Sequence, residues 1–355
     1  MLICPRLEIN IEKIKQNTKT LVDRSRADNI SIAAVTKAFC AIPEVVDAII
    51  EGGVKYLADS RIKNLRKLKD KDLPKWLLRL PMQSQVKEVI KYADVSLNSE
   101  LETIKRLSEA SLEENKVHGI ILMIDLGDLR EGLWEDKVLE TVEEVIKLDG
   151  VKLMGIGTNL TCYGGVLPNK DNLGKLRDIG KELEDKFNLE LEIISGGNSS
   201  SLDLLENRGL PNKINNLRLG ESIVLGREAA YGKAIEGTYQ DAFQLVAEIV
   251  ELKEKPTVPI GEIGRDAFGN KPVFEDIGIR KRAILAVGRQ DLNPNNIIAL
   301  DEKISIFGAS SDHLIIDVTD SERDYKVGDE VRFNLEYGAL LGLSTSEYVY
   351  KKIKK

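Results

Sequence analysis

Histidine and cysteine are scarce in this chain, and their scarcity excludes several kinds of active site. The 355 residues include two histidines, His118 and His313, and three cysteines, at positions 4, 40 and 162. Two imidazoles cannot build a multi-histidine zinc site, and both lie in polar contexts that favour ordinary surface or strand-edge roles. Three cysteines without a CxxC pair form neither a disulfide framework nor a metal cage. We therefore expect no metal and a reducing compartment, the cytoplasm.

Long apolar runs and basic stripes are also missing. No stretch of about 18 uncharged apolar residues occurs, so the sequence predicts no membrane-spanning helix. Aromatic residues make up 5% of the chain, and 51 Lys plus Arg stand against 58 Asp plus Glu, a net charge of −7. A mildly acidic chain without interleaved basic and stacking residues is not typical of a nucleic-acid binder.

Short apolar runs alternate with segments of helical periodicity over about 200 residues. One such helix, residues 42–53, ends in a glycine pair, and another is predicted to begin with Ser99 and Glu102 as a capping box. Eight strand–helix units predict a (β/α)8 barrel. An open doubly wound sheet fits the same alternation, but it usually has a glycine fingerprint after its first strand, where this chain has Lys37. The runs span residues 30–38, 56–59, 76–80, 95–98, 119–126, 151–158, 191–194 and 217–225.

The pattern changes after Gly226. Strand-like runs follow one another between Gly, Pro, Asn and Asp, and no long helical pattern separates them. We therefore predict a barrel domain over residues 1–230 and a mostly β domain over residues 231–355. Residues 253–272 read as a long loop, and loops of that length inside a domain are commonly functional.

Working groups of such a barrel stand at the carboxyl ends of its strands. Lys37 closes the run IAAV, where an apolar setting would lower its pKa and free the amine as a nucleophile. The alternative is a lysine whose charged end reaches solvent from the strand end.

The last two strand ends suggest a phosphate site. The segment SGGNSSS, residues 195–201, is rich in backbone N–H and hydroxyl groups, and the next run contains Arg218, which emerges near the barrel mouth, and Gly220, which lets the backbone approach a ligand. Phosphate sites at the loops after strands seven and eight recur in this barrel, although Ser/Gly loops also cap helices without binding anything. Together with Lys37 they suggest a phosphorylated cofactor held as a Schiff base.

Two further strand ends carry polar groups. Arg130 lies in DLGDLREG and is either part of a turn with a surface ion pair or a fork that holds a carboxylate. Asn159 and Cys162 follow the sixth strand, and we interpret Cys162 as a buried, inert thiol.

These motifs, taken in order, resemble those of a known family. LEINIEKIKQN, AVTKA, DLREG, TN, GGNSS and RLG follow the order of the fold-type III pyridoxal 5′-phosphate enzymes of the alanine racemase class. VPIGEIGRDAFGN, VGRQD and EYGALL resemble its alanine/ornithine racemase-like branch. The resemblance covers nearly the whole chain and implies an amino-acid racemase that acts on ornithine or a related amino acid such as alanine, lysine or serine.

The resemblance also implies roles for individual residues. Lys37 becomes the Schiff-base lysine and one acid/base, Arg218 faces the pyridine nitrogen, and Arg130 holds the phenolic oxygen or the substrate carboxylate. Asn159 occupies the place of a histidine that packs against the ring, which is a departure from the family. The phosphate is expected to contact Asn198, Ser199, Ser200, Gly220, Glu221, Ser222 and Tyr337.

The acid/base on the opposite face is the open point. Alanine racemases use a tyrosine of the partner subunit, yet this chain has no tyrosine between positions 239 and 325. The corresponding loop offers Glu262, Arg265 and Asp266, which could equally serve loop structure or dimer salt bridges. Cys162 and Tyr163 on the barrel are alternatives.

The resemblance extends to the substrate and the assembly. Arg289 and Asp291, in VGRQD, are expected to contact the substrate, with the carboxylate pairing with a side-chain ammonium such as that of ornithine. We expect a head-to-tail homodimer in which the β domain of one subunit completes the site of the other. The alternatives are a fold-type III lyase or decarboxylase, or a noncatalytic protein that handles the cofactor.

Overall fold

The chain forms two compact units in a computed structural model that describes residues 3–354. One unit runs from Glu12 to Tyr239, and the other combines the residues up to Ile11 with those from Gln240 onward. The division thus falls after Tyr239 instead of residue 230, and it assigns the first strand to the second unit. The cause is strand pairing, because β1 (Arg6–Asn10) pairs with strands near residues 245 and 352.

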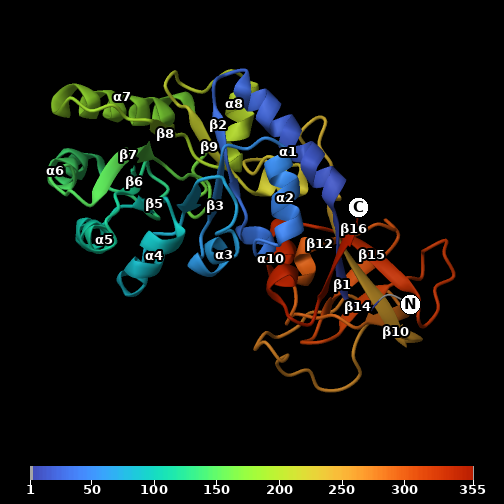
Figure 1. Cartoon of the computed structure of the whole chain (residues 1–355). Helices are drawn as coiled ribbons and strands as arrows, with labels where there is room; N and C mark the ends of the chain where they lie inside the picture. Colours follow the sequence, from blue (N-terminus) through green and yellow to red (C-terminus); the bar gives the residue numbers. More distant parts are fainter. Residues whose placement is uncertain (1–2, 355) are drawn as a thin grey trace. The chain divides into compact units, whose positions relative to one another are not determined.

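The first unit is a closed barrel of eight parallel strands, which confirms the predicted fold class (Figure 1). Each of the eight apolar runs overlaps one strand. All neighbouring strands of the barrel pair in parallel, as the helical connections between them require. The strands are β2 (Ser31–Val35), β3 (Tyr56–Asp59), β4 (Lys75–Leu77), β5 (Val95–Asn98), β6 (His118–Met123), β7 (Val151–Gly157), β8 (Ile193–Ser195) and β9 (Asn216–Leu219).

Amphipathic helices connect these strands and bury their apolar faces. Helix α7 shows why one of them begins where it does, because Asn169 and Asn172 form a reciprocal capping box. The helices are α1 (Ile11–Arg26), α2 (Pro43–Glu51), α3 (Ile62–Lys67), α4 (Val86–Tyr92), α5 (Leu101–Glu113), α6 (Glu135–Val145), α7 (Lys170–Phe187), α8 (Leu202–Glu206) and α9 (Glu221–Leu225), with short 3₁₀ turns η1 (Lys37–Phe39), η2 (Gln83–Gln85) and η3 (Ser199–Ser201).

Two local predictions in this unit are wrong. The run 217–225 is not one strand, since β9 ends at Leu219, Gly220 follows as a cap residue, and α9 occupies Glu221–Leu225; short runs of this kind suit either element when both are buried. Ser99 does not cap α5, whose cap position is Glu100 without a side-chain hydrogen bond. The glycine pair after α2 is as expected, with Gly53 at φ +91°.

Apolar side chains fill the barrel and support the strand ends above them. Trp76 is almost fully buried and stacks on Tyr56 with ring centroids 4.5 Å apart. His118 also belongs to the interior: it is 3% exposed, and its Nε2 lies 2.8 Å from Ser96 Oγ, so the surface role expected for it is wrong. The interior cluster comprises Ala33, Val35, Ala58, Trp76, Val95, Leu97, Ile121, Met123 and Ile193.

The second unit is an antiparallel sheet in the order β12-β15-β10-β11-β14-β13, with β1 and β16 attached to it. β1 pairs antiparallel with β10 and parallel with β16. The long loop spans residues 257–278, so its first residues as predicted belong to a strand instead. The elements are β10 (Phe243–Pro256), β11 (Ile279–Leu285), η4 (Pro294–Asn296), β12 (Ile297–Ala299), β13 (Ser305–Ala309), β14 (Leu314–Asp317), β15 (Glu330–Leu335), α10 (Tyr337–Thr345) and β16 (Tyr350–Lys354).

Among the described residues, no helix is both long and apolar enough to cross a membrane.

Candidate active site

Lys37 stands at the carboxyl end of β2, on the turn η1. Thr36 occupies the cap position of this turn and is fully buried, whereas the Lys37 side chain is exposed. The expected apolar setting is therefore wrong: the neighbours of Lys37 in sequence are buried, and its own amine reaches the solvent-facing side of the strand end. An exposed amine on a fixed turn is accessible to a carbonyl compound that enters the barrel mouth.

Arg218 on β9 is a buried cation among the strand ends. It is 4% exposed, and it donates from Nη1 to Ser195 Oγ at 2.5 Å and from Nη2 to the Thr158 carbonyl at 2.6 Å. Burial lowers the pKa of Arg218 to about 10, so the guanidinium remains charged near neutral pH. A buried cation held by two neutral acceptors retains donors and positive charge for an acceptor placed above it.

The loop after β8 and the start of α9 form one cluster of donors. Asn198 Oδ1 accepts the Ser200 N–H at 2.8 Å and so caps η3. Ser199 Oγ lies 3.0 Å from Ser222 Oγ and accepts the Ser222 N–H at 3.2 Å, which ties the two loops together. Gly197 has φ +112°, a conformation that favours glycine and sets the sharp turn.

A phosphate fits this cluster. The Ser200 side-chain oxygen is buried, yet it has no hydrogen-bond partner among residues 3–354. A buried polar group without a partner costs free energy, and the phosphate oxygens of a cofactor are the acceptors that this hydroxyl lacks. The predicted residues Asn198 to Ser200 and Gly220 to Ser222 thus lie in adjoining loops, and their contact with the cofactor stays a prediction.

Arg130 lies on the loop after β6 and is paired with a residue that sequence reasoning missed. Its guanidinium binds the Glu131 carboxylate at both oxygens, with Nη2 2.5 Å from Oε1. This hydrogen bonding to Glu131 raises the pKa of Arg130. The pair is a surface ion pair of adjacent residues, and the exposed guanidinium keeps a face open to solvent.

The two aspartates of the same loop are structural. Asp128 is buried and accepts the N–H groups of Thr161, Tyr163 and Val166 at 3.0–3.2 Å, which fixes the loop after β7 against the loop after β6. Asp125 accepts two N–H groups of its own turn. These carboxylates are engaged as acceptors of backbone N–H groups, so they act as scaffolding.

Asn159 and Cys162 are brought together by Asn198. The Asn198 Nδ2 group donates to Asn159 Oδ1 and to the Leu160 carbonyl at 3.0 Å, and Cys162 Sγ lies at 3.4 Å. Asn159 Nδ2 is buried and has no partner among the described residues, so it offers a donor at the barrel mouth. Cys162 is exposed, and its interpretation as a buried thiol is wrong.

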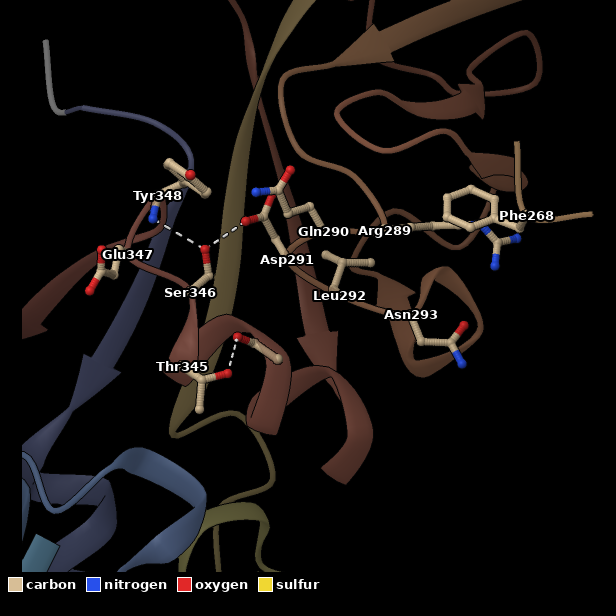
Figure 2. Close-up of a pocket in the computed structure, with 11 residues that line it drawn as sticks. Phe268, Arg289, Gln290, Asp291, Leu292, Asn293, Thr345, Ser346, Glu347 and Tyr348 are labelled. Carbon is tan, nitrogen blue, oxygen red and sulfur yellow. Dashed lines mark hydrogen bonds between the residues drawn. The ribbon is translucent and has the colours of Figure 1, made fainter. Parts of the chain in front are cut away.

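A pocket of about 670 Å³ lies in the second unit and contains Asp291 (Figure 2). Asp291 is 6% exposed; its Oδ1 accepts the Ser346 hydroxyl at 2.6 Å and its Oδ2 accepts the Gly288 N–H at 3.4 Å. Arg289 places its guanidinium 4.9 Å from the centre of the Phe268 ring and donates to the Ala309 carbonyl at 2.8 Å. A carboxylate in such a pocket suits a small cation.

The long loop carries the remaining acid/base candidates. Glu262 and Arg265 are exposed. Asp266 accepts the N–H groups of Asn270 at 2.8 Å and Phe268 at 2.9 Å, and these backbone bonds, with that of Asn270 first, lower its pKa. A carboxylate whose charged form is stabilised in this way is a weaker base.

Tyr337 is half-buried at the first position of α10, with Glu336 as the cap residue. Its contact with the cofactor phosphate stays a prediction, as do the substrate contacts of Arg289 and Asp291.

Another side chain that sequence reasoning missed is Asp59, fully buried at the end of β3 next to the Lys37 turn. The available signal was its place as the last residue of the run YLAD, the same kind of position that drew attention to Lys37.

Comparison with known proteins identifies the family. Residues 9–228 match the family of the alanine racemase N-terminal domain. The chain is 53% identical to the ornithine racemase of Acetoanaerobium sticklandii over 98% of this chain and 99% of that protein. It is 42% identical to the lysine racemase of Thermotoga maritima over 99% of this chain and 98% of that protein.

A solved structure with the same fold is the alanine racemase of Bartonella henselae with covalently bound pyridoxal phosphate. The TM-score is 0.75 at 17% identity, over 99% of this chain and all (100%) of that one. The family match, the two relatives and the cluster of donor groups suited to a phosphate all indicate the same family. The chain belongs to the alanine racemase family and is a pyridoxal 5′-phosphate-dependent amino-acid racemase.

Proposed function

We propose that this racemase interconverts the enantiomers of ornithine, with lysine as the next candidate. The observation that carries the proposal is the 53% identity to an ornithine racemase over nearly the full length of both chains. The Asp291 pocket supports it, because a buried carboxylate is suited to the distal ammonium of a diamino acid and has no partner in alanine.

The residues of the barrel mouth divide the work of binding and proton transfer. When bound, pyridoxal 5′-phosphate withdraws electrons from the substrate α carbon and makes the α proton removable. Ser199, Ser200 and Ser222 hold the phosphate through hydroxyl and N–H groups, and Arg218 stabilises the ring nitrogen with a charge that it does not readily release. Lys37 binds the cofactor and moves the α proton on one face.

The opposite face needs a second acid/base. Glu262 is our first candidate, since it is an exposed carboxylate without the backbone bonds that weaken Asp266 as a base. Arg265 is assigned to the same loop as a charge partner. Cys162 is the candidate on the barrel, where Asn198 contacts its sulfur.

We further propose that the protein works in the cytoplasm as a head-to-tail homodimer. In this arrangement the β unit of one subunit, with Tyr337 and Asp291, completes the barrel site of the other. Free thiols at all three cysteines are in keeping with a reducing compartment.

The test is to incubate the purified protein with pyridoxal 5′-phosphate and L-ornithine in deuterated water. We expect optical rotation to fall to zero while total ornithine stays constant and deuterium enters the α position. Release of carbon dioxide, ammonia or an aldehyde would instead indicate a decarboxylase or lyase. Cofactor binding without α-deuteration of any amino acid would indicate a noncatalytic cofactor protein.

A further inference from the structure

Asp59 has an environment that nothing in the reaction so far explains. Its side chain is fully buried at the carboxyl end of β3 and accepts hydrogen bonds from three neighbours. Thr36 Oγ1 donates at 2.6 Å, the Arg61 N–H at 2.8 Å, and Asn64 Nδ2 at 3.1 Å to one carboxyl oxygen and 3.2 Å to the other. Every one of these bonds is accepted, which is the pattern of an ionised carboxylate.

Burying a carboxylate is unfavourable, so its position calls for a compensating role. Burial raises the pKa of Asp59, and the hydrogen bonds from Thr36, Arg61 and Asn64 act in the opposite direction. The remaining contact is that of Leu78 after β4, whose N–H donates to the Asp59 carbonyl at 2.9 Å. Through Thr36, the buried carboxylate is bonded to the residue that precedes Lys37.

The turn that carries Lys37 is strained and needs external support. Cys40 and Ala41 have φ of 55° and 50°, a left-handed conformation that side-chain-bearing residues seldom adopt in succession. The Ala41 N–H closes the turn on the Thr36 carbonyl at 3.1 Å, and Lys67 of α3 donates to the Cys40 carbonyl at 2.7 Å. The Thr36 hydroxyl, bonded to Asp59, anchors the other side of this turn.

We propose that Asp59 is a positioning residue for Lys37, holding the strained turn that carries the lysine through its hydrogen bond with Thr36. The proposal rests on the proposed function only in that Lys37 is the cofactor-binding amine. Asp59 itself touches neither substrate nor cofactor in this assignment.

The test uses the cofactor-free protein, so it does not depend on racemisation. Hydrogen exchange, read by peptide mass spectrometry, reports the opening of the turn at the Cys40 and Ala41 amides. In Asp59→Asn we expect exchange at these amides to rise about tenfold or more, with exchange in α2 unchanged, because the Thr36 hydroxyl loses its charged acceptor. In the control Asp94→Asn, which removes an exposed carboxylate that accepts the Lys75 N–H at 2.7 Å at the other end of the barrel, we expect no change.

A purely structural role gives a different result. In that case Asp59→Asn lowers the melting temperature and raises exchange in the turn and in α2 alike, and the proposal is overturned. A protein that fails to racemise any amino acid but shows the rise in exchange confined to the turn contradicts the proposed function and leaves the Asp59 assignment standing.

A second variant covers the case in which Asp59→Asn does not fold. Thr36→Val removes the hydroxyl and keeps the Asp59 carboxylate, so only the hydrogen bond between the turn and Asp59 is lost. We expect hydrogen exchange at the Cys40 and Ala41 amides to rise about tenfold or more, with exchange in α2 unchanged. Unchanged exchange in the turn would falsify the positioning role.

Discussion

The two units present their functional candidates in different ways. In the barrel, the proposed cofactor-binding groups are fixed by neighbours: Arg218 by Ser195 and Thr158, and Ser199 by Ser222. In the β unit, the candidates Glu262 and Arg265 are exposed on a loop of 22 residues, 257–278, in which Asp266 accepts hydrogen bonds from the loop backbone. The barrel is therefore preorganised for the cofactor, whereas the loop leaves its acid/base candidates exposed to solvent.

The largest effect is expected at the preorganised centre. Lys37→Ala removes the amine that binds the cofactor and moves one proton, so racemisation should fall by about 10³-fold or more. Visible absorbance of the cofactor-loaded protein should be lost, and borohydride should no longer fix the cofactor to the chain. The control is Lys63→Ala, an exposed lysine on α3, which should keep both signals. A variant that retains absorbance and activity would show that the barrel site is wrongly assigned.

The next largest effect on racemisation is expected from the long loop, residues 257–278, where two neighbouring carboxylates should differ in their importance. Glu262→Gln should reduce racemisation about 10²-fold, because it removes a proton carrier while leaving cofactor absorbance intact. Asp266→Asn should cost less than about tenfold, since this side chain serves the turn. In Glu262→Gln, exchange of the α proton that starts from one enantiomer should be impaired more than exchange that starts from the other. If Cys162→Ser shows that asymmetry and Glu262→Gln does not, the second acid/base belongs to the barrel instead.

A smaller effect should distinguish ornithine from alanine as a substrate. Asp291→Asn should raise the KM for ornithine by about 10- to 100-fold, the value of one charged hydrogen bond, and change the KM for alanine little. The control Ser346→Ala removes the hydroxyl that donates a hydrogen bond to Asp291, and it should change the KM for ornithine only a few-fold. Equal losses for ornithine and alanine would mean that the pocket does not recognise the distal ammonium.

The smallest effect is one of stability and concerns the barrel alone. Burial lowers the pKa of His118 to about 4, below its ordinary 6.5, while nearby Asp94 acts in the opposite direction. As pH falls from 6.5 to 4, the unfolded chain takes up a proton that the folded barrel does not, so stability falls by roughly 2–3 kcal/mol; above pH 6.5 this dependence vanishes.

Urea unfolding at pH 7.5, 6 and 5 checks this expectation. In His118→Gln, the free energy of unfolding should no longer show this part of its dependence on pH. An equal pH dependence in both proteins would mean that the His118 side chain is more exposed to solvent than in the structure.

The parts of the fold that follow from local patterns were predictable. The barrel strands and Lys37 follow from apolar periodicity and strand ends, and Arg218 from its place in the last apolar run. The pairing of β1 was not, because its partners lie more than 230 residues away and no local signal specifies them. The exposure of Cys162 and the burial of Asp59 depend on neighbouring loops, and a single sequence does not show which strand ends face each other.

The pairing of β1 with β16 has a consequence for how the chain is assembled. Ribosomal synthesis produces Arg6–Asn10 long before Tyr350–Lys354, yet these strands are neighbours in one sheet. The barrel, residues 12–239, is in sequence an insertion into the β unit and can fold while the rest is still being made. The first strand must remain an unpaired edge until β10 has been synthesised, and its second neighbour, β16, can pair with it only later.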